Sequence, residues 1–335
     1  MNSPTIISTI NKLPIGKTFA HLIRREFIEH RGSYFFVPLF LGLLMLAFVL
    51  ITLVGNYITG TGDIIGNISF NEVNFSNIGD ILEKLQNASL EVREKVMSVF
   101  ITIVSAPLIA ALPFVMVFSV LSCLFDDRKN KSILFLKSLP FSDTQEVTSK
   151  LISAIILAPL LTIVLVFVFQ LAFLVIAALV VAFNGGNVWD IVWAPVPIFT
   201  QPLGIFFSLV VVILWQLPFW GWLTLVSAIA PRVPFLIASV PLVIVVLLEE
   251  IFYQTQIFGN FMLNVIALNF AHIFENISVE KELSFSGFDV NIITPGDAFQ
   301  VMGESLGMGN FYGMVALGSA LILGAIYIRK SNINF

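Results

Sequence analysis

Long apolar runs alternate with polar segments along the whole chain. A helix needs about 20 predominantly apolar residues to cross the hydrocarbon core of a bilayer. Six runs come close to or exceed this length, and the third is long enough that we expect tilt or a kink at Pro159. The predicted spans are residues 35–55, 96–125, 151–183, 203–230, 235–258 and 311–328.

The composition places these spans in a membrane rather than in a soluble core. The chain has 335 residues, of which 58% are hydrophobic and 11% charged, whereas soluble domains carry about 25% charged residues. Cys123 is the only cysteine, so the chain has no internal disulfide, and three scattered histidines predict no metal site. The sequence also has no basic patch with interleaved aromatic residues, so it gives no reason to expect a nucleic-acid partner. We therefore expect one all-α integral membrane domain over residues 1–335.

Lysine and arginine are distributed unevenly among the connecting segments. Of the 17 basic residues, 13 fall in the N-terminal segment 1–34, the loop 126–150, the turn after the fourth span, and the tail. Cytoplasmic loops carry an excess of basic residues, so both termini are predicted to be cytoplasmic. Segments 56–95 and 259–310 are then external, as is 184–202. Part of the first, residues 78–95, is expected to form a short helix.

The N-terminal segment has the pattern of an amphipathic helix. Apolar side chains recur at helical spacing opposite a basic face, and Gly32 is expected to end the helix. This pattern predicts an interfacial helix on the inner membrane surface, or else a charged flank that only sets orientation. The residues assigned to this helix are Phe19, Leu22, Ile23, Arg24, Arg25 and Phe27.

The external segment 259–310 begins with a further apolar stretch over 261–274. Fourteen residues are too few for a crossing, so the stretch is expected to be interfacial or re-entrant. We predict a re-entrant external hairpin between the fifth and sixth spans.

The loop 126–150 contains a second amphipathic segment over 132–139, which Pro140 ends. Ser142 or Asp143 is placed to cap a second helix that leads into the third span. The apolar face of the first helix must be buried, either against its own bundle or against a partner protein. That face consists of Ile133, Phe135, Leu136 and Leu139.

This loop resembles the permease subunits of type 2 ABC transporters, the exporter-like family. The family pattern runs from an acidic residue and an arginine through a small residue and leucines to a Ser/Leu-Pro turn, then a lysine at the third span. Two departures stand out: aspartate replaces the usual glutamate, and Lys131 replaces a frequent glycine. The matching residues are Asp127, Arg128, Ser132, Leu134, Leu139, Pro140, Ser142 and Lys150.

The resemblance implies a transport subunit that is not itself an enzyme. Two copies of a separate ABC ATPase would bind ATP and magnesium, and the loop helix around 132–139 would sit in a groove of that subunit as a coupling helix. A second permease chain, most simply an identical one, would complete the pathway in a bacterial inner membrane. The chain has no Gly-x-x-x-x-Gly-Lys-[Ser/Thr] motif of its own, and it carries no cofactor.

Two glutamates in the fifth span allow other functions. Glu249 and Glu250 lie where a charge is costly, which makes them candidates for an intramembrane polar site or a proton relay of an ion-coupled transporter. With His272 they also resemble the motifs of intramembrane glutamate proteases. However, Gln254 stands where those proteases have arginine, and a second histidine motif is missing. Alternatively, the helix ends early and both glutamates lie at the outer interface.

Overall fold

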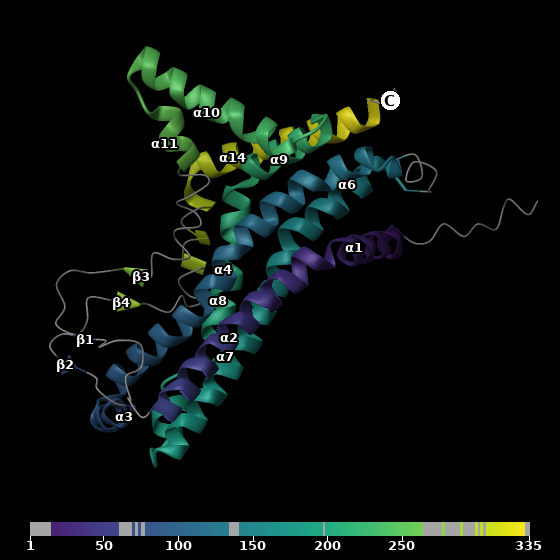
Figure 1. Ribbon diagram of the computed structural model, residues 1–335. Coiled ribbons are helices and arrows are strands. Elements are labelled where there is room, and N and C mark those ends of the chain that lie inside the picture. Colours follow the sequence, from purple (N-terminus) through teal and green to yellow (C-terminus); the bar gives the residue numbers. More distant parts are fainter. Residues whose placement is uncertain are drawn as a thin grey trace, which may run out of the picture.

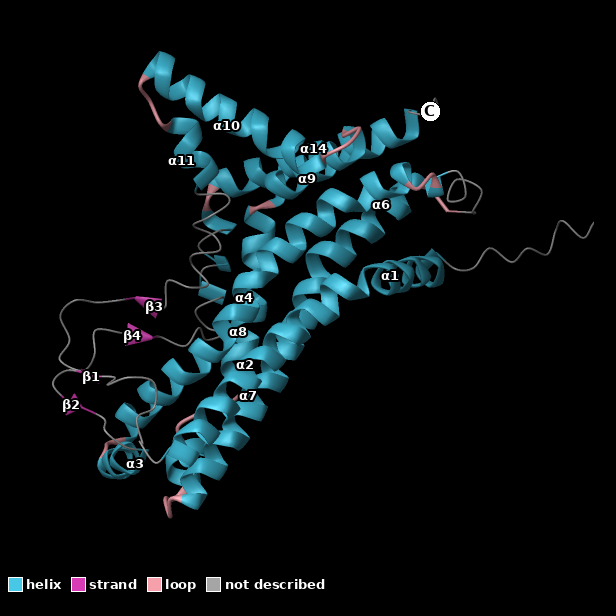
Figure 2. Cartoon of the chain, viewed as in Figure 1, coloured by secondary structure: helices cyan, strands magenta, loops and turns pink. Residues whose placement is uncertain are grey.

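Helices dominate the computed structural model (Figures 1 and 2). The structure describes residues 15–59, 69–70, 73–74, 78–133, 141–196, 198–263, 277–278, 289–290, 299–300, 302–303 and 306–331. The α-helices named below are α1 (Ile15–Arg31), α2 (Val37–Thr59), α3 (Ile78–Asn87), α4 (Leu90–Lys129), α6 (Asp143–Ile152), α7 (Ala158–Phe183), α8 (Thr200–Trp215), α9 (Leu217–Ile229), α10 (Pro234–Tyr253), α11 (Ile257–Leu263) and α14 (Gly309–Ser331). Three π-helical segments join or follow them, namely η2 (Gly32–Phe36), η3 (Ser153–Leu157) and η4 (Trp189–Trp193).

The length and apolarity of these helices confirm a multi-pass membrane protein. Within the described residues, five helices are long and apolar enough to cross a membrane, or six if α8 and α9 count as one span bent by 64°. Four two-residue strands form two antiparallel pairs, β1 (Ser69–Phe70) with β2 (Val73–Asn74) and β3 (Ile277–Ser278) with β4 (Asp289–Val290). Apart from these short pairs, which the sequence pattern did not predict, the described fold is all-α.

Several predicted boundaries shift in the structure. Gly32 does not end the first helix, because η2 carries the chain from α1 directly into α2. The fifth span ends at Tyr253 rather than at 258, because Gln254 takes a left-handed backbone (φ 49°) that closes α10. The short helix expected over 78–95 is α3 alone, since the chain re-enters a helix at Leu90 and continues as α4.

The core lies where α4, α7, α9 and α14 pack together. Gln170 on α7 donates a hydrogen bond to Ser105 on α4, with 2.7 Å between nitrogen and oxygen, and both side chains are buried. Glycines bring α9 and α14 into backbone contact, since a Cβ at Gly221 would lie 2.7 Å from the carbonyl oxygen of Gly318. Small residues serve this purpose in membranes, where apolar surface alone gives no drive for helix association.

The two ends of the bundle are built differently. At one end lie α1, α6 and the end of α14 (Figure 1). At the other, the side chain of Leu82 on α3 is buried with residues of α7 and η4, and the Arg93 guanidinium donates to the carbonyl of Asp190 at 3.0 Å. Among the candidate spans, α10 is the least enclosed by the rest of the chain and projects away from the bundle in Figure 1. Its base is held where the Trp222 indole N–H on α9 donates to the carbonyl of Ala238 at 3.1 Å.

Candidate functional site

Five buried charged side chains meet at the end of the bundle that holds α1 and α6. The Lys150 ammonium lies 3.2 Å from Glu26 Oε2 and 3.3 Å from Asp127 Oδ1. The Arg329 guanidinium pairs with Asp127 Oδ2 at 3.0 Å and also with the Glu146 carboxylate. We call these five residues, Glu26, Asp127, Glu146, Lys150 and Arg329, the ion-pair cluster. They join α1, the end of α4, helix α6 and the end of α14.

Local sequence positions α6 for this role. Ser142 forms a capping box with Gln145, in which the hydroxyl accepts from the Gln145 backbone N–H and the Gln145 side chain accepts from that of Ser142. This capping confirms one of the two alternatives that the sequence allowed and fixes where the helix begins. Glu146 and Lys150 then lie four residues apart on one face, and both are buried.

The α1 contribution comes from its inward face. Leu22 and Glu26 are one helical turn apart and both are buried, so α1 packs on the protein through this stripe. The Arg25 guanidinium, about one-third exposed, also pairs with Glu26. Phe27 packs against the small buried cluster that contains Tyr34 of η2, whereas Arg24 is exposed. The predicted amphipathic pattern is therefore present, but its buried stripe includes an acidic residue.

The cluster is close to electrically balanced. Its three carboxylates face Lys150 and Arg329 inside and Arg25 at the edge. Buried ionised groups are tolerated only when paired and hydrogen-bonded, and removing one partner leaves an uncompensated charge. The arrangement therefore holds four separate segments in one fixed geometry.

A second polar junction fixes α4 to α9 beside the cluster. Arg128 donates to the backbone carbonyls of Ser227 and Ala230, at 2.7 and 2.9 Å, at the C-terminal end of α9. A cation suits this end of a helix, where carbonyls lack partners. The buried Ser227 hydroxyl donates to the Leu121 carbonyl and accepts from the Leu124 backbone N–H.

The first residues of the predicted coupling loop follow directly from the cluster. Lys131 has a left-handed backbone with φ 55°, a conformation that glycine adopts without strain but that other residues adopt uncommonly. The Ser132 hydroxyl donates to the Asp127 carbonyl at 3.2 Å, and Ile133 is buried. The remaining predicted contact residues lie outside the described part of the chain: Leu134, Phe135, Leu136, Leu139 and Pro140.

Sequence reasoning found part of the cluster and missed the rest. The sequence pattern points to Asp127 and Lys150, whereas it marks Arg329 only as a basic flank and gives no role to Glu26 or Glu146. A usable signal existed for Glu26, because it lies four residues after Leu22 on the apolar side of α1.

The structure gives Glu249 a local structural role. Its carboxylate accepts hydrogen bonds from the backbone N–H groups of Ile257, Phe258 and Gly259, and from the Thr255 hydroxyl at 3.1 Å. It therefore caps the start of α11 just beyond the end of α10. Glu250 is exposed beside it, and His272 lies outside the described residues.

Replacing Glu249 with alanine is expected to loosen α11, because the backbone N–H groups of residues 257–259 then lose their acceptor. Hydrogen–deuterium exchange over residues 257–263 should become faster than in the parent protein. Glu250→Ala is the matched control and should leave this exchange unchanged. Equal effects of the two substitutions would contradict the capping role.

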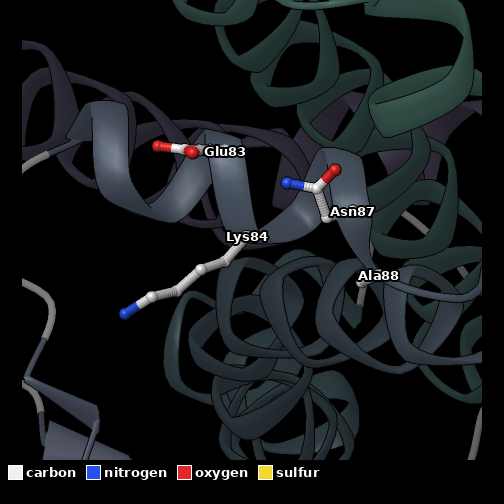
Figure 3. Close-up of a pocket in the computed structure, with 4 residues that line it drawn as sticks. All are labelled: Glu83, Lys84, Asn87 and Ala88. Carbon is white, nitrogen blue, oxygen red and sulfur yellow. The ribbon is translucent and has the colours of Figure 1, made fainter.

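A pocket of about 460 Å³ lies along α3 and the residue that follows it, at the end of the bundle opposite the ion-pair cluster. It is lined by Glu83, Lys84, Asn87 and Ala88, and Figure 3 shows the Glu83 and Lys84 side chains extending in different directions. Within the described residues, no group of three His, Cys, Asp or Glu side chains could hold a metal ion. Neither observation assigns chemistry to this face.

Comparison with known proteins adds no identification. No family model, curated protein or solved structure matches this chain. The function must therefore be inferred from the residues and their geometry.

Proposed function

We propose that this chain is the membrane-spanning permease subunit of an ATP-driven ABC exporter of type 2. The observation that carries the proposal is the ion-pair cluster. Asp127 begins the loop that carries the family-like pattern, and Arg329 and Lys150 tie it to the last span and the third span. A force applied to that loop is thereby passed to several helices at once.

The partners follow from this assignment. Two copies of an ABC ATPase bind ATP and magnesium and dock at the end of the bundle where α1, α6 and the end of α14 meet. That end is cytoplasmic in a bacterial inner membrane, which agrees with its excess of basic residues. A second copy of this chain completes the pathway, and α10, enclosed so little by its own chain, has apolar surface available to lipid or to that copy.

Purification from the native host in mild detergent tests the assignment directly. We expect an ATPase with a P-loop motif to co-purify in a stoichiometric amount, as identified by mass spectrometry. Chemical crosslinking before extraction keeps a labile complex together. A crosslinked complex that contains no P-loop ATPase would overturn the proposal.

Replacing both Phe135 and Leu136 with aspartate should then uncouple ATP hydrolysis by the partner ATPase from the permease. Burying two new charges at an apolar contact is unfavourable, so affinity for the co-purifying ATPase should fall roughly tenfold or more, and stimulation of its activity should be lost. The measurement is ATP hydrolysis against permease concentration in reconstituted vesicles.

The matched control adds the same two charges elsewhere at this end of the bundle. Asn130→Asp/Thr144→Asp changes two exposed side chains and should keep both affinity and stimulation. Stimulation that survives the 135/136 substitutions in a folded protein would show that the interface lies elsewhere.

A further inference from the structure

Each of the three π-helical segments in the described chain ends in the same way. The residue after the segment donates its N–H to the carbonyl five positions earlier, and a proline follows immediately. In η2 this donor is Val37, with Gly32 as acceptor, before Pro38. In η3 it is Ala158, with Ser153 as acceptor, before Pro159.

Proline explains the widened turn. It has no N–H to donate, and its ring collides with the carbonyl four residues before it, which for Pro159 is that of Ile155. A π-helical turn moves this carbonyl aside and lets the preceding residue bond one position further back. The kink expected at Pro159 is thus realised as a π-helical turn inside a helix that continues from 143 to 183.

Two of these turns lie side by side in the bundle. Tyr34 of η2 is buried in one small cluster with Ala158, which closes η3, and Val115 of α4. Direct contacts also join η2 to α7 and η3 to α1. Both turns therefore lie at one level, immediately beyond the ion-pair cluster along α1 and α6.

The contacts on the two sides of this level differ, although α4 runs through both sides. On one side the cluster, Arg128 and Ser227 bind α1, α6, α4, α9 and α14 together. On the other side α2 packs closely on α7, since a Cβ at Gly42 would lie 2.0 Å from the Phe169 ring. Helix α8 contacts α7 and joins α9 through the 64° bend at Gln216. The chain thus passes from one side to the other through an irregular turn at η2, at η3 and at Gln216, whereas α4 crosses this level as a continuous helix that packs on both sides.

We infer that η2 and η3 form a paired hinge about which α2 and α7 tilt together against the ion-paired end of the bundle. Breaks in regular helical hydrogen bonding are where helices bend. In the proposed exporter this hinge would convert movement of the docked ATPases into movement of two spans. That last step rests on the proposed function, whereas the hinge itself does not.

Hydrogen–deuterium exchange on the purified full-length chain in lipid nanodiscs tests the hinge without any ATPase. Peptides covering 33–37 and 153–158 should exchange about tenfold faster than the α4 peptide 115–119, because transient opening is cheaper in an irregular turn. The α4 peptide is the depth-matched control, since Val115 belongs to the same buried cluster as Tyr34 and Ala158. Equal exchange in all three peptides would overturn the inference.

Substitution of the prolines supplies an independent arm. Pro159→Ala restores a backbone donor for the Ile155 carbonyl and should slow exchange across 153–158. Because Tyr34 rests on Ala158, it should also slow exchange across 33–37. Pro241→Ala in α10, where proline lies inside an ordinary α-helix, is the control and should change neither peptide.

The outcomes separate the hinge from the function. If Pro159→Ala leaves exchange across 33–37 unchanged, the two turns move independently and the paired hinge is overturned. If exchange confirms the hinge but no ATPase co-purifies with the chain, the hinge is retained and the exporter assignment is rejected.

Discussion

Replacing Arg329 with methionine is expected to cost about 3–5 kcal/mol of folding free energy, because it leaves the buried Glu146 carboxylate without its cation and removes one of the two cations that pair with Asp127. Arg329 pairs with both Asp127 and Glu146, and all three side chains are buried. The measurement is the thermal unfolding midpoint in detergent, followed by tryptophan fluorescence. Lys330→Gln removes an exposed charge from the adjacent position and should leave the midpoint almost unchanged.

A double substitution separates the loss of charge pairing from the loss of packing. Glu146→Gln in the Arg329→Gln background removes the carboxylate that has lost its paired cation, while Asp127 keeps its contact with Lys150. The double variant should therefore unfold at a higher temperature than Arg329→Gln alone. If Arg329→Met melts at the same temperature as Lys330→Gln, the cluster does not stabilise the fold.

The sequence predicted the architecture well because the membrane imposes it. Every backbone polar group in hydrocarbon must be satisfied within the segment, so long apolar runs must be helices. The second and third runs correspond to α4 and to the helix through α6 and α7. Boundaries were less predictable, because a single left-handed residue such as Gln254 ends a helix without interrupting its apolar pattern.

The ion-pair cluster could be predicted only in part. Asp127 and Lys150 stand out as charges at the ends of apolar runs, but their partners are separated from them by up to 202 residues along the chain. Which charges meet depends on how each helix is rotated about its axis, and that rotation is set by packing. A count of basic residues treats Arg329 as an orientation signal, whereas the structure uses it as a buried counter-ion.

The π-helical turns illustrate the same limit. Proline within an apolar run predicts an irregularity, and Pro159 has one. Pro107 and Pro113 interrupt an equally apolar run, yet α4 continues through both. The local pattern around a proline therefore does not decide between a regular helix and a widened turn, because the outcome also depends on packing against the neighbouring helices.

Replacing Gly318 with alanine should destabilise the protein, whereas replacing Gly313, another glycine on the same helix, should stabilise it. A Cβ at Gly318 would lie 2.4 Å from the Leu217 carbonyl carbon and 2.7 Å from the Pro218 nitrogen. These are backbone atoms at the start of α9, so Gly318→Ala forces the two helices apart at the α8–α9 bend. We expect it to destabilise the protein by about 1–3 kcal/mol.

At Gly313 a Cβ would meet no atom within 4 Å, so Gly313→Ala should instead stabilise α14 by about 0.5–1 kcal/mol, the usual gain in a helix. Both unfolding midpoints are measured in the same detergent, and midpoints that shift in the same direction would contradict close packing at Gly318. Together with Arg329→Met, this pair tests α14 at two places, the backbone contact with α9 and the ion pairs near its C-terminal end. If both contacts are as strong as their geometry indicates, α14 is held against α9 and the cluster as one body, which is the body that the inferred hinge requires.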